Sequence, residues 1–275
     1  LEREKQVAED AAKALEEVVA AGAVKGTSNA DVASKSDVII TMVPNSPHVR
    51  AAVFDKGGIA EGAKAGLDLI DMSSIAPLES KDIAEKCKEI GINMMDAPVS
   101  GGEPKAIDGT LSIMGGGKKE TFDKYYDMLM VMGGSAVYVG PIGSGNVAKL
   151  ANQMIVAINI AACAEAFTFA AKMGTDPELV YQAIRGGLAG STVMDAKVPM
   201  MIDGNYKPGF RIVLHTKDLT NALNAAHAIN SPAPFTAQAM EILQFLNAHD
   251  CGADDHDAIV KYYEAISGTS VVKEK

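Results

Sequence analysis

Cysteines and basic residues are scarce in this sequence, and both shortages restrict what the protein can be. The three cysteines lie far apart, at positions 87, 163 and 251, and form no C-x-x-C pair and no pattern with histidine. This spacing excludes a disulfide framework and a structural zinc site, and it indicates a reducing, cytoplasmic compartment. The sequence has 25 lysines and arginines and 35 acidic residues, which gives a net charge of -10. This charge argues against nucleic acid or an anionic membrane as a partner.

Long apolar runs and metal-ligand patterns are scarce as well. No run of about 18 uncharged apolar residues lies near residue 1, so we expect no signal peptide and no membrane anchor. The stretch MIVAINIAACAEAFTFAA from Met154 is apolar, but it contains Asn159 and Glu165, so we predict a buried helix of a soluble protein there. The five histidines show no ligand spacing, and HDCGADDH (249–256) is interpreted as a polar turn, so we expect no metal site.

Strand-like and helix-like segments alternate over the first half of the chain. Short β-branched or apolar runs end in small polar residues, and segments rich in Ala, Glu and Lys lie between them. This alternation predicts an α/β fold with a doubly wound parallel sheet, in which ligands bind beyond the carboxyl ends of the strands. The strand-like runs are SDVIITMVP (36–44), LDLIDMSS (67–74), INMMDAPVSGG (92–102), TLSIMGGG (110–117) and SAVYVG (135–140).

After Gly140 the strand pattern stops, and only helical segments and turns remain. We therefore divide the chain into an α/β domain at 1–141 and an all-α domain at 142–275. A predicted helix from about Asn146 to Met173, on the order of 40 Å long, is apolar on nearly every side. Because other helices must cover such a helix, we expect it to be the spine of the second domain, and we expect a homo-oligomer, a dimer or a tetramer.

The segment GPIGSGNVAKLANQ (140–153) contains residues 143–148, which match the dinucleotide-binding pattern G-x-G-x-x-A. A true fingerprint lies between the first strand and the first helix of a βαβ unit, and an acidic residue follows about twenty residues later. Here the preceding strand is the last one of the sheet, and no strand follows it. We therefore interpret the match as a glycine turn rather than as a pyrophosphate site.

The helix after this turn places Lys149 and Asn152 on one face, because residues three apart are neighbours on a helix surface. An ammonium beside a carboxamide, in a cleft between two domains, suits proton donation to a carbonyl oxygen. The spacing alone leaves a solvated lysine and a helix-start asparagine as the alternative. In the same way, Ser100 with Gly101 and Gly102 offers a hydroxyl and bare amides for a small anion, or is only a turn after a strand.

The stretches DAPVSGGEPKAIDGTLSIMGGG, GPIGSGNVAKLANQ and HTKDLTNAL follow one another in this order. Together they resemble the signature set of the β-hydroxyacid dehydrogenase family, which includes the 3-hydroxyisobutyrate dehydrogenases. Further stretches, VSGGEPKAIDGTLS, LVYQAIRGGLAGST and KPGFRIVLHTKDL, are similar to its tartronate semialdehyde reductase (2-hydroxy-3-oxopropionate reductase) branch. The resemblance covers about residues 18–268. It implies a Rossmann-like cofactor-binding domain, a long interdomain helix and an all-α substrate and oligomerisation domain.

The resemblance also implies a reaction and its residues. It implies that NADH or NADPH reduces 2-hydroxy-3-oxopropanoate to glycerate, with Lys149 as the general acid and Asn152 orienting the substrate. The residues implied to hold the substrate carboxylate are Ser100, Gly101 and Gly102. The residues implied to line the cofactor are Val43, Pro44, Ser74 and Lys217, the last beside the nicotinamide. A loop near the substrate matches Gly186, Gly187, Gly190 and Ser191, for which a glycine-rich helix connection is the alternative.

One feature of the family is missing from this sequence. The family begins with a strand carrying G-x-G-x-x-G, whose amides and following helix bind pyrophosphate. This sequence opens with LEREKQVAEDAAKALEEVVAAGAV, a predicted helix, and Glu2 is interpreted as a remnant of the acid that ends the family's second strand. We therefore expect weakened cofactor binding and an uncovered sheet edge. Two hypotheses remain: a working reductase, with 3-hydroxyisobutyrate as the alternative substrate, or a cofactor-poor form that binds small carboxylates.

Overall fold

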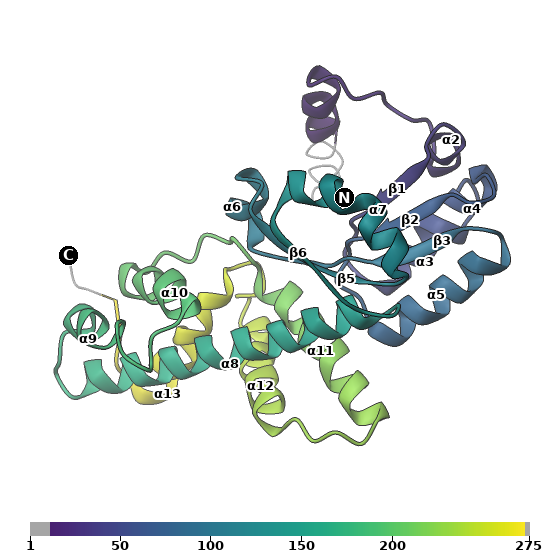
Figure 1. The fold of residues 1–275 in the computed structure, drawn as a ribbon. Coiled ribbons are helices and arrows are strands. Elements are labelled where there is room, and N and C mark those ends of the chain that lie inside the picture. Colours follow the sequence, from purple (N-terminus) through teal and green to yellow (C-terminus); the bar gives the residue numbers. More distant parts are fainter. Residues whose placement is uncertain (1–11, 273–275) are drawn as a thin grey trace.

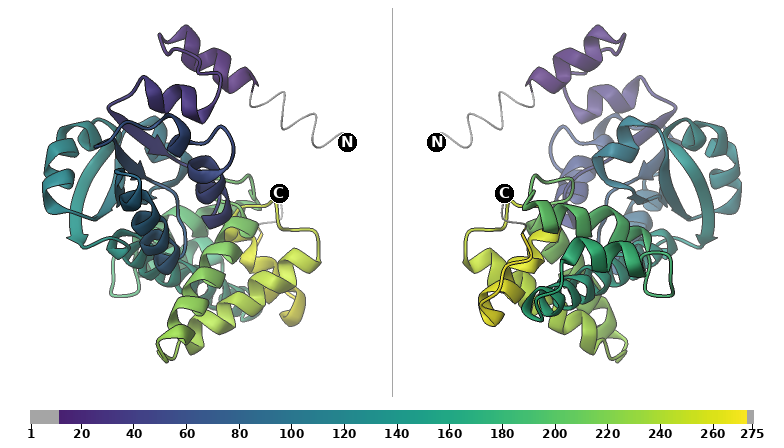
Figure 2. Two further views of the ribbon diagram at one scale, coloured as in Figure 1. Left: turned by 90° about the vertical axis from the view of Figure 1, so that its right-hand side faces the viewer. Right: turned by 90° about the vertical axis from the view of Figure 1, so that its left-hand side faces the viewer.

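The computed structural model describes residues 12–272, in which one long helix joins a sheet-containing part to a group of helices (Figure 1). The first part ends with strand β6 (Gly133–Gly140), and the second begins with helix α8 (Ser144–Lys172). The domain boundary predicted at 141/142 lies in the turn between these two elements. Figure 2 shows the helices that follow α8 grouped together beside the sheet-containing part.

Six strands form one sheet in the order β1-β2-β3-β5-β4, and β6 pairs with the free side of β5. The first three strands run parallel and in register, so that Thr41, Asp71 and Asp96 lie side by side at their carboxyl ends. The sequence predicts this α/β arrangement. The candidate active site lies beyond these strand ends, where the polar residues are found. The bounds are β1 (Val38–Thr41), β2 (Asp68–Asp71), β3 (Asn93–Asp96), β4 (Val99–Ser100) and β5 (Leu111–Gly116).

The sheet is not parallel throughout, and this corrects one detail of the prediction. Strand β5 runs antiparallel to β3 and β4, with Asp96 opposite Gly116, while β6 runs parallel to β5. The cause is the short connection at 101–110, which contains only helix α6 (Gly102–Ile107). A crossover to a parallel neighbour needs about a dozen residues or more, so the chain turns back along the strand it has just left.

Helices cover both faces of the sheet. Successive residues of a strand point to opposite faces, and Leu69 packs with helix α5 (Pro77–Glu89) while Ile70 packs with helix α7 (Lys119–Met132). Because both faces are buried, the strands are continuous apolar runs in the sequence rather than alternating ones. The face that carries α5 also carries the shorter helices α2 (Asn29–Ser34), α3 (Ser46–Phe54) and α4 (Ile59–Gly62).

Helix α8 is the central element of the second part and is about 43 Å long for its 29 residues. Within residues 12–272 it is the one helix long and apolar enough to cross a membrane. In the structure Ile160, Ala164 and Phe167 of this helix belong to the core of the helical part. The elements packed along it are α9 (Pro177–Ile184), α10 (Thr192–Asp203), α11 (Ile212–Ala228), α12 (Pro234–Ala248), η1 (His256–Ile259) and α13 (Val260–Ser267).

The predicted N-terminal helix is found over residues 12–20, which stand away from the sheet in Figures 1 and 2 and are exposed apart from the half-buried Leu15. The rest of that prediction, including the interpretation of Glu2, lies outside the described residues. Strand β1 pairs only with β2 among the described strands, and Ile40 on it is exposed. Within the described part of the chain, β1 is therefore an edge strand of the sheet.

Candidate active site

The glycine turn at residues 143–148 binds a carboxylate of its own chain. Gly143 has φ +87, and its amide donates to Oδ1 of Asp96 at 2.7 Å, while the amide of Asn146 donates to Oδ2 at 2.7 Å. A side chain at Gly145 would lie 2.2 Å from the carbonyl oxygen of Met114, so only glycine fits there. Burial raises the pKa of Asp96 to about 6, although both amide bonds act in the opposite direction. The turn anchors α8 to the end of β3, in agreement with its interpretation as something other than a pyrophosphate site.

About one helical turn after Gly145 on α8, Lys149 is buried, with 6% of its surface exposed. Its Nζ lies 3.3 Å from Oε1 of Gln153 and 6.0 Å from the ring centroid of Phe210. The alternative of a solvated lysine is therefore wrong. Burial lowers the pKa of Lys149 to about 8; Asp218 acts against this shift and Lys217 adds to it. A lysine with this pKa can give up and regain a proton near neutral pH, which a general acid must do.

Gln153 connects Lys149 to helix α11. Its Oε1 also accepts a hydrogen bond from Nδ2 of Asn152 at 3.0 Å, and its Nε2 donates to Oδ2 of Asp218 at 2.6 Å. Gln153 is buried and Asp218 has 1% of its surface exposed, so the contact is closed to water. The sequence analysis selected neither Gln153 nor Asp218. Gln153 lies one helical turn after Lys149, and Asp218 directly follows Lys217, so both lie close in sequence to residues that were selected.

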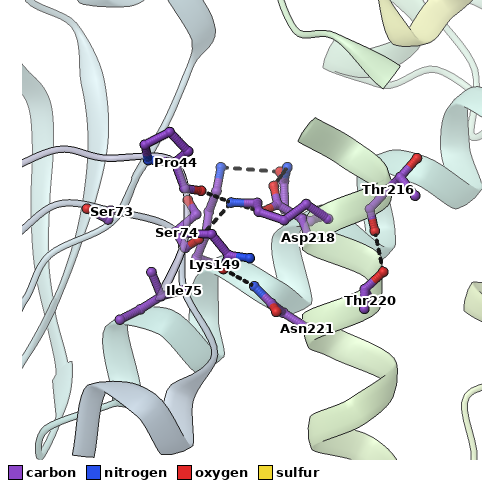
Figure 3. A network of polar contacts seen from close by, with 12 residues as sticks. Pro44, Ser73, Ser74, Ile75, Lys149, Thr216, Asp218, Thr220 and Asn221 are labelled. Carbon is purple, nitrogen blue, oxygen red and sulfur yellow. Dashed lines mark hydrogen bonds and ion pairs between the residues drawn. The ribbon is translucent and has the colours of Figure 1, made fainter. Parts of the chain in front are cut away.

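Lys217 links the two parts of the molecule at the ends of β1 and β2. Its Nζ donates to the carbonyl oxygens of Pro44 at 2.9 Å and Ser74 at 2.7 Å, and it lies 2.8 Å from Oδ1 of Asp218. Figure 3 shows Pro44 and Ser74 on the strand-end loops facing Asp218 and Asn221 on α11. The predicted cofactor-lining residues therefore meet at one place. In this structure the Lys217 ammonium is bound to backbone carbonyls and to its neighbouring carboxylate.

A cavity of about 900 Å³ opens between the strand ends and the helical part. It brings together Lys149 and Asn152 with the loop at 100–102, in which Gly101 and Gly102 have φ +142 and +67. Val43, Pro44 and Lys217 do not line it, and the amide of Val43 donates to the hydroxyl of Ser73 at 2.9 Å. The residues that complete its wall include Met42, Ser74, Val156, Lys197, Met200, Phe210, Asp255 and His256.

The glycine-rich segment at 186–191 does not line this cavity. The amide of Gly190 donates to the carbonyl oxygen of Gly187 at 3.0 Å, and the Ser191 hydroxyl accepts from the amide of Met194 at 3.0 Å as the cap of α10. The segment serves in this chain as the connection between α9 and α10. This observation favours the alternative that the sequence left open.

The wall of the cavity on the helical part contains Lys197 and Asp255, which the sequence analysis did not select. The carboxylate of Asp255 accepts hydrogen bonds from the amides of Gly209 at 2.8 Å and Phe210 at 2.9 Å, and from Nζ of Lys197 at 2.7 Å. Burial works against its charge, but the neighbouring His256, Lys197 and the amide of Phe210 lower the pKa of Asp255. Among residues 12–272 there is no group of three or more His, Cys, Asp or Glu side chains placed to hold a metal ion.

The residues present fit one end of a nicotinamide dinucleotide. Ser74 and Met42, at the ends of β2 and β1, line the same cavity as Lys149, so they could hold a nicotinamide ring in the cavity that contains the proton donor. The pyrophosphate end has no match among the described residues, because the amides of the one G-x-G-x-x-A turn are bonded to Asp96. The residues at the strand ends therefore fit the nicotinamide end of the cofactor.

Comparison with known proteins places the chain among dehydrogenases. A family model for the NAD binding domain of 6-phosphogluconate dehydrogenase matches residues 4–140, and one for the NAD-binding of NADP-dependent 3-hydroxyisobutyrate dehydrogenase matches residues 143–263. The 2-hydroxy-3-oxopropionate reductase of Escherichia coli (strain K12) is 40% identical over 252 residues, which are 92% of this chain and 86% of that protein. The mitochondrial 3-hydroxyisobutyrate dehydrogenase of Bos taurus is 36% identical, over 90% of this chain and 76% of its own.

A solved structure shows the same architecture. The 3-hydroxyisobutyrate dehydrogenase of Mycobacterium tuberculosis, described with L-serine, has a TM-score of 0.79 at 29% identity and matches 86% of this chain and 82% of its own. Its sheet-plus-helical-region fold is the one described above. The chain is therefore an NAD(P)-dependent oxidoreductase, and it belongs to the 3-hydroxyisobutyrate dehydrogenase-like family of β-hydroxyacid dehydrogenases.

Proposed function

We propose that this protein reduces 2-hydroxy-3-oxopropanoate (tartronate semialdehyde) to glycerate. The observation that carries the proposal is Lys149, a buried lysine whose pKa is lowered to about 8 and which shares a cavity with the Ser100–Gly102 loop. A relative that is 40% identical over 92% of the chain is named for this reaction. The same cavity holds a proton donor for an aldehyde oxygen and donors for a carboxylate, which are the two groups of this substrate.

The loop at 100–102 binds the substrate carboxylate in this mechanism. The Ser100 hydroxyl and the amides of Gly101 and Gly102 are donors, and both glycines have a positive φ that an L side chain rarely adopts. A side chain at Gly102 would also enter the approach to these amides. Because the carboxylate is fixed at one end of a three-carbon acid, the aldehyde at the other end reaches toward Lys149.

Lys149 stabilises the oxygen of the aldehyde and then protonates it. When bound, the reduced nicotinamide supplies the hydride that the aldehyde carbon receives. The Lys149 ammonium offsets the negative charge that develops on the oxygen and donates its proton to it. Asn152 holds Oε1 of Gln153, the same atom that Lys149 approaches, and so fixes the direction of the ammonium as well as offering a donor to the substrate.

The reaction is tested by following NADH and NADPH oxidation with purified protein. The substrates compared are 2-hydroxy-3-oxopropanoate and 2-methyl-3-oxopropanoate, the aldehyde related to 3-hydroxyisobutyrate. We expect the larger kcat/KM for the hydroxyl-bearing aldehyde. A larger value for the methyl-bearing aldehyde would instead favour the reaction named for the Bos taurus relative.

For the polypeptide of residues 1–275, we further propose that cofactor binding is weak. Pyrophosphate sites rely on several charge-assisted bonds of about 1.5–3 kcal/mol each, and the loss of two costs about two to four orders of magnitude in affinity. Its dissociation constant for NADH or NADPH is therefore expected in the millimolar range or above, measured by fluorescence titration. The cofactor-poor alternative, which binds small carboxylates without efficient turnover, predicts carboxylate binding with no measurable oxidation of either cofactor.

We also propose that the protein is a homo-oligomer, a dimer or a tetramer, and that it works in the cytoplasm. Several apolar residues of α8 and its surroundings, including Ile155, Phe169 and Leu179, are exposed in the single chain. Packing them against a second copy would remove this apolar surface from water. Light scattering should give a multiple of 28.7 kDa, and a mass of 28.7 kDa at micromolar concentration would exclude the assembly.

A further inference from the structure

Two buried histidines lie behind the cavity and are bonded to each other. Nδ1 of His256, at the start of η1, lies 3.0 Å from Nδ1 of His215 on α11. Nε2 of His215 lies 3.1 Å from the carbonyl oxygen of Gln153 on α8. The ring of Phe210 stands against both imidazoles, with centroids 5.7 Å and 5.5 Å away. The pair therefore connects three elements of the helical part at one point of the cavity wall.

The partners determine which nitrogen carries each proton. A carbonyl oxygen can only accept, so Nε2 of His215 carries a hydrogen and donates it to Gln153. His215 is buried, and burial lowers its pKa although the carbonyl of Gln153 and the Asp218 carboxylate act in the opposite direction. The ring is therefore neutral and its Nδ1 is bare. That bare nitrogen accepts from Nδ1 of His256. Because burial also lowers the pKa of His256, this ring is neutral too, and its Nε2 is left as a bare acceptor.

The bare Nε2 of His256 lies near the ion pair of Asp255 and Lys197. It lies 3.8 Å from Oδ1 of Asp255, and that oxygen is 2.7 Å from Nζ of Lys197. Both His256 and Lys197 line the cavity that contains Lys149. An ammonium has three donors, and one of those on Lys197 is used by Asp255. The wall thus presents an acceptor, Nε2 of His256, and a donor, Nζ of Lys197, that share Oδ1 of Asp255 as a neighbour. A hydroxyl group, which donates once and accepts, complements this pair.

We propose that Nε2 of His256 and the ammonium of Lys197 bind the hydroxyl on C2 of the substrate and thereby select it over a β-aldehyde acid that carries a methyl group there. This inference rests on the proposed function, since it names the group that separates 2-hydroxy-3-oxopropanoate from its closest competitor. Nζ of Lys149 lies 6.0 Å from the centroid of the Phe210 ring, and the His256 ring lies 5.5 Å from it, so the proton donor and the proposed hydroxyl site flank the same phenyl ring. A methyl group at this wall would leave the acceptor and the donor without partners, which is how polar sites reject apolar analogues.

Two substitutions remove the acceptor in different ways. His256→Phe keeps a ring against Phe210 but loses both nitrogens. His256→Asn places an amide donor where Nδ1–H was, which retains the bond to His215, but the side chain ends short of Nε2. The matched control is His249→Phe, which alters an exposed histidine that stacks on Phe245 outside the cavity.

The measured quantity is the ratio of kcat/KM for 2-hydroxy-3-oxopropanoate to that for 2-methyl-3-oxopropanoate. Both His256 variants should lower this ratio by about 10- to 100-fold, mainly through the hydroxyl-bearing substrate, while His249→Phe leaves it unchanged. An unchanged ratio in either folded variant would overturn the proposal. Equal losses for both substrates would do so as well, because they would show that His256 acts only on the structure around it.

A binding measurement separates this inference from the proposed reaction. Tartronate and methylmalonate differ only in the hydroxyl or methyl group on C2, and calorimetry measures their affinities without turnover. The parent protein should bind tartronate at least tenfold more tightly, and His256→Asn should lose this preference. If the parent protein shows the preference but reduces neither aldehyde, the proposed reaction is wrong and the hydroxyl site stands. If it shows no preference for tartronate, the hydroxyl site is wrong, whatever the turnover.

Discussion

The pH dependence of reduction should follow the titration of Lys149. Burial lowers the pKa of this lysine to about 8, and a general acid works only in its protonated form. Below pH 8 most of the lysine carries its proton, and above it each further pH unit removes about nine-tenths of the remaining protonated form. We therefore expect kcat/KM to fall about eightfold between pH 8.5 and 9.5. An ordinary lysine, with a pKa of about 10.4, would lose less than a fifth over that interval.

Two neighbours of Lys149 allow this profile to be moved in opposite directions. The Asp218 carboxylate raises the pKa of Lys149, so Asp218→Asn should shift the fall in kcat/KM to lower pH. The Lys217 charge lowers that pKa, so Lys217→Met should shift the fall to higher pH. Both variants also alter contacts near the strand ends, so their maximal rates will drop. The position of the inflection, rather than the height of the curve, is the informative quantity.

The assay is cofactor oxidation at one fixed concentration of NADH or NADPH over pH 6–10.5, with kcat/KM for the aldehyde fitted to a single ionisation. His249→Phe, which lies outside the cavity, serves as the control and should reproduce the parent curve. A flat profile up to pH 10 would refute Lys149 as a general acid with a lowered pKa. Shifts of the same sign in the two charge variants would refute the electrostatic explanation of its pKa.

Three further variants test other parts of the site. Asn152→Ala should raise KM for the aldehyde more than it lowers kcat, since Asn152 orients rather than donates the proton; a pure kcat effect in steady-state kinetics would contradict this. Ser100→Ala removes one donor to a charged group and should weaken tartronate binding in calorimetry by about 1–3 kcal/mol, so unchanged affinity would exclude the Ser100–Gly102 loop as the carboxylate site. Asp96→Ala leaves the amides of Gly143 and Asn146 without their acceptor. It should lower the free energy of unfolding in urea by about 2–4 kcal/mol, and a loss under 1 kcal/mol would show that water replaces the carboxylate.

The parts of the fold that the sequence predicts are those that depend on local pattern. Continuous apolar runs at 67–74 and 92–102 indicate strands buried on both faces, and residues 146–173 indicate a long covered helix, because burial and periodicity act within a few residues of each other. The antiparallel return of β5 was missed because it depends on the length of one short connection. That connection is evident only once the bounds of α6 are known.

The residues of the site that belong to sequence motifs could also be predicted. Lys149, Asn152 and the Ser100–Gly102 loop could be selected from their motifs, and the structure places all of them on one cavity. The residues that contact Lys149 and the cavity wall from other helices could not be selected from the sequence. Asp218 reaches Gln153 across 65 positions of the chain, and His256 reaches His215 across 41. Such pairs have no spacing signal, because the folding of separate helices alone brings them together.

The most direct test of the proposed reaction follows the hydride and the proton donor in one experiment. Cofactor that carries deuterium at both positions of C4 of the reduced nicotinamide is supplied with 2-hydroxy-3-oxopropanoate, and the product is analysed by mass spectrometry and NMR. We predict glycerate with one deuterium on C3 from the parent protein. We also predict at least about 100-fold slower formation of this product by Lys149→Ala, whose folding is checked by its circular dichroism spectrum. Glycerate without deuterium, or an equal rate in the two proteins, would contradict the proposed mechanism.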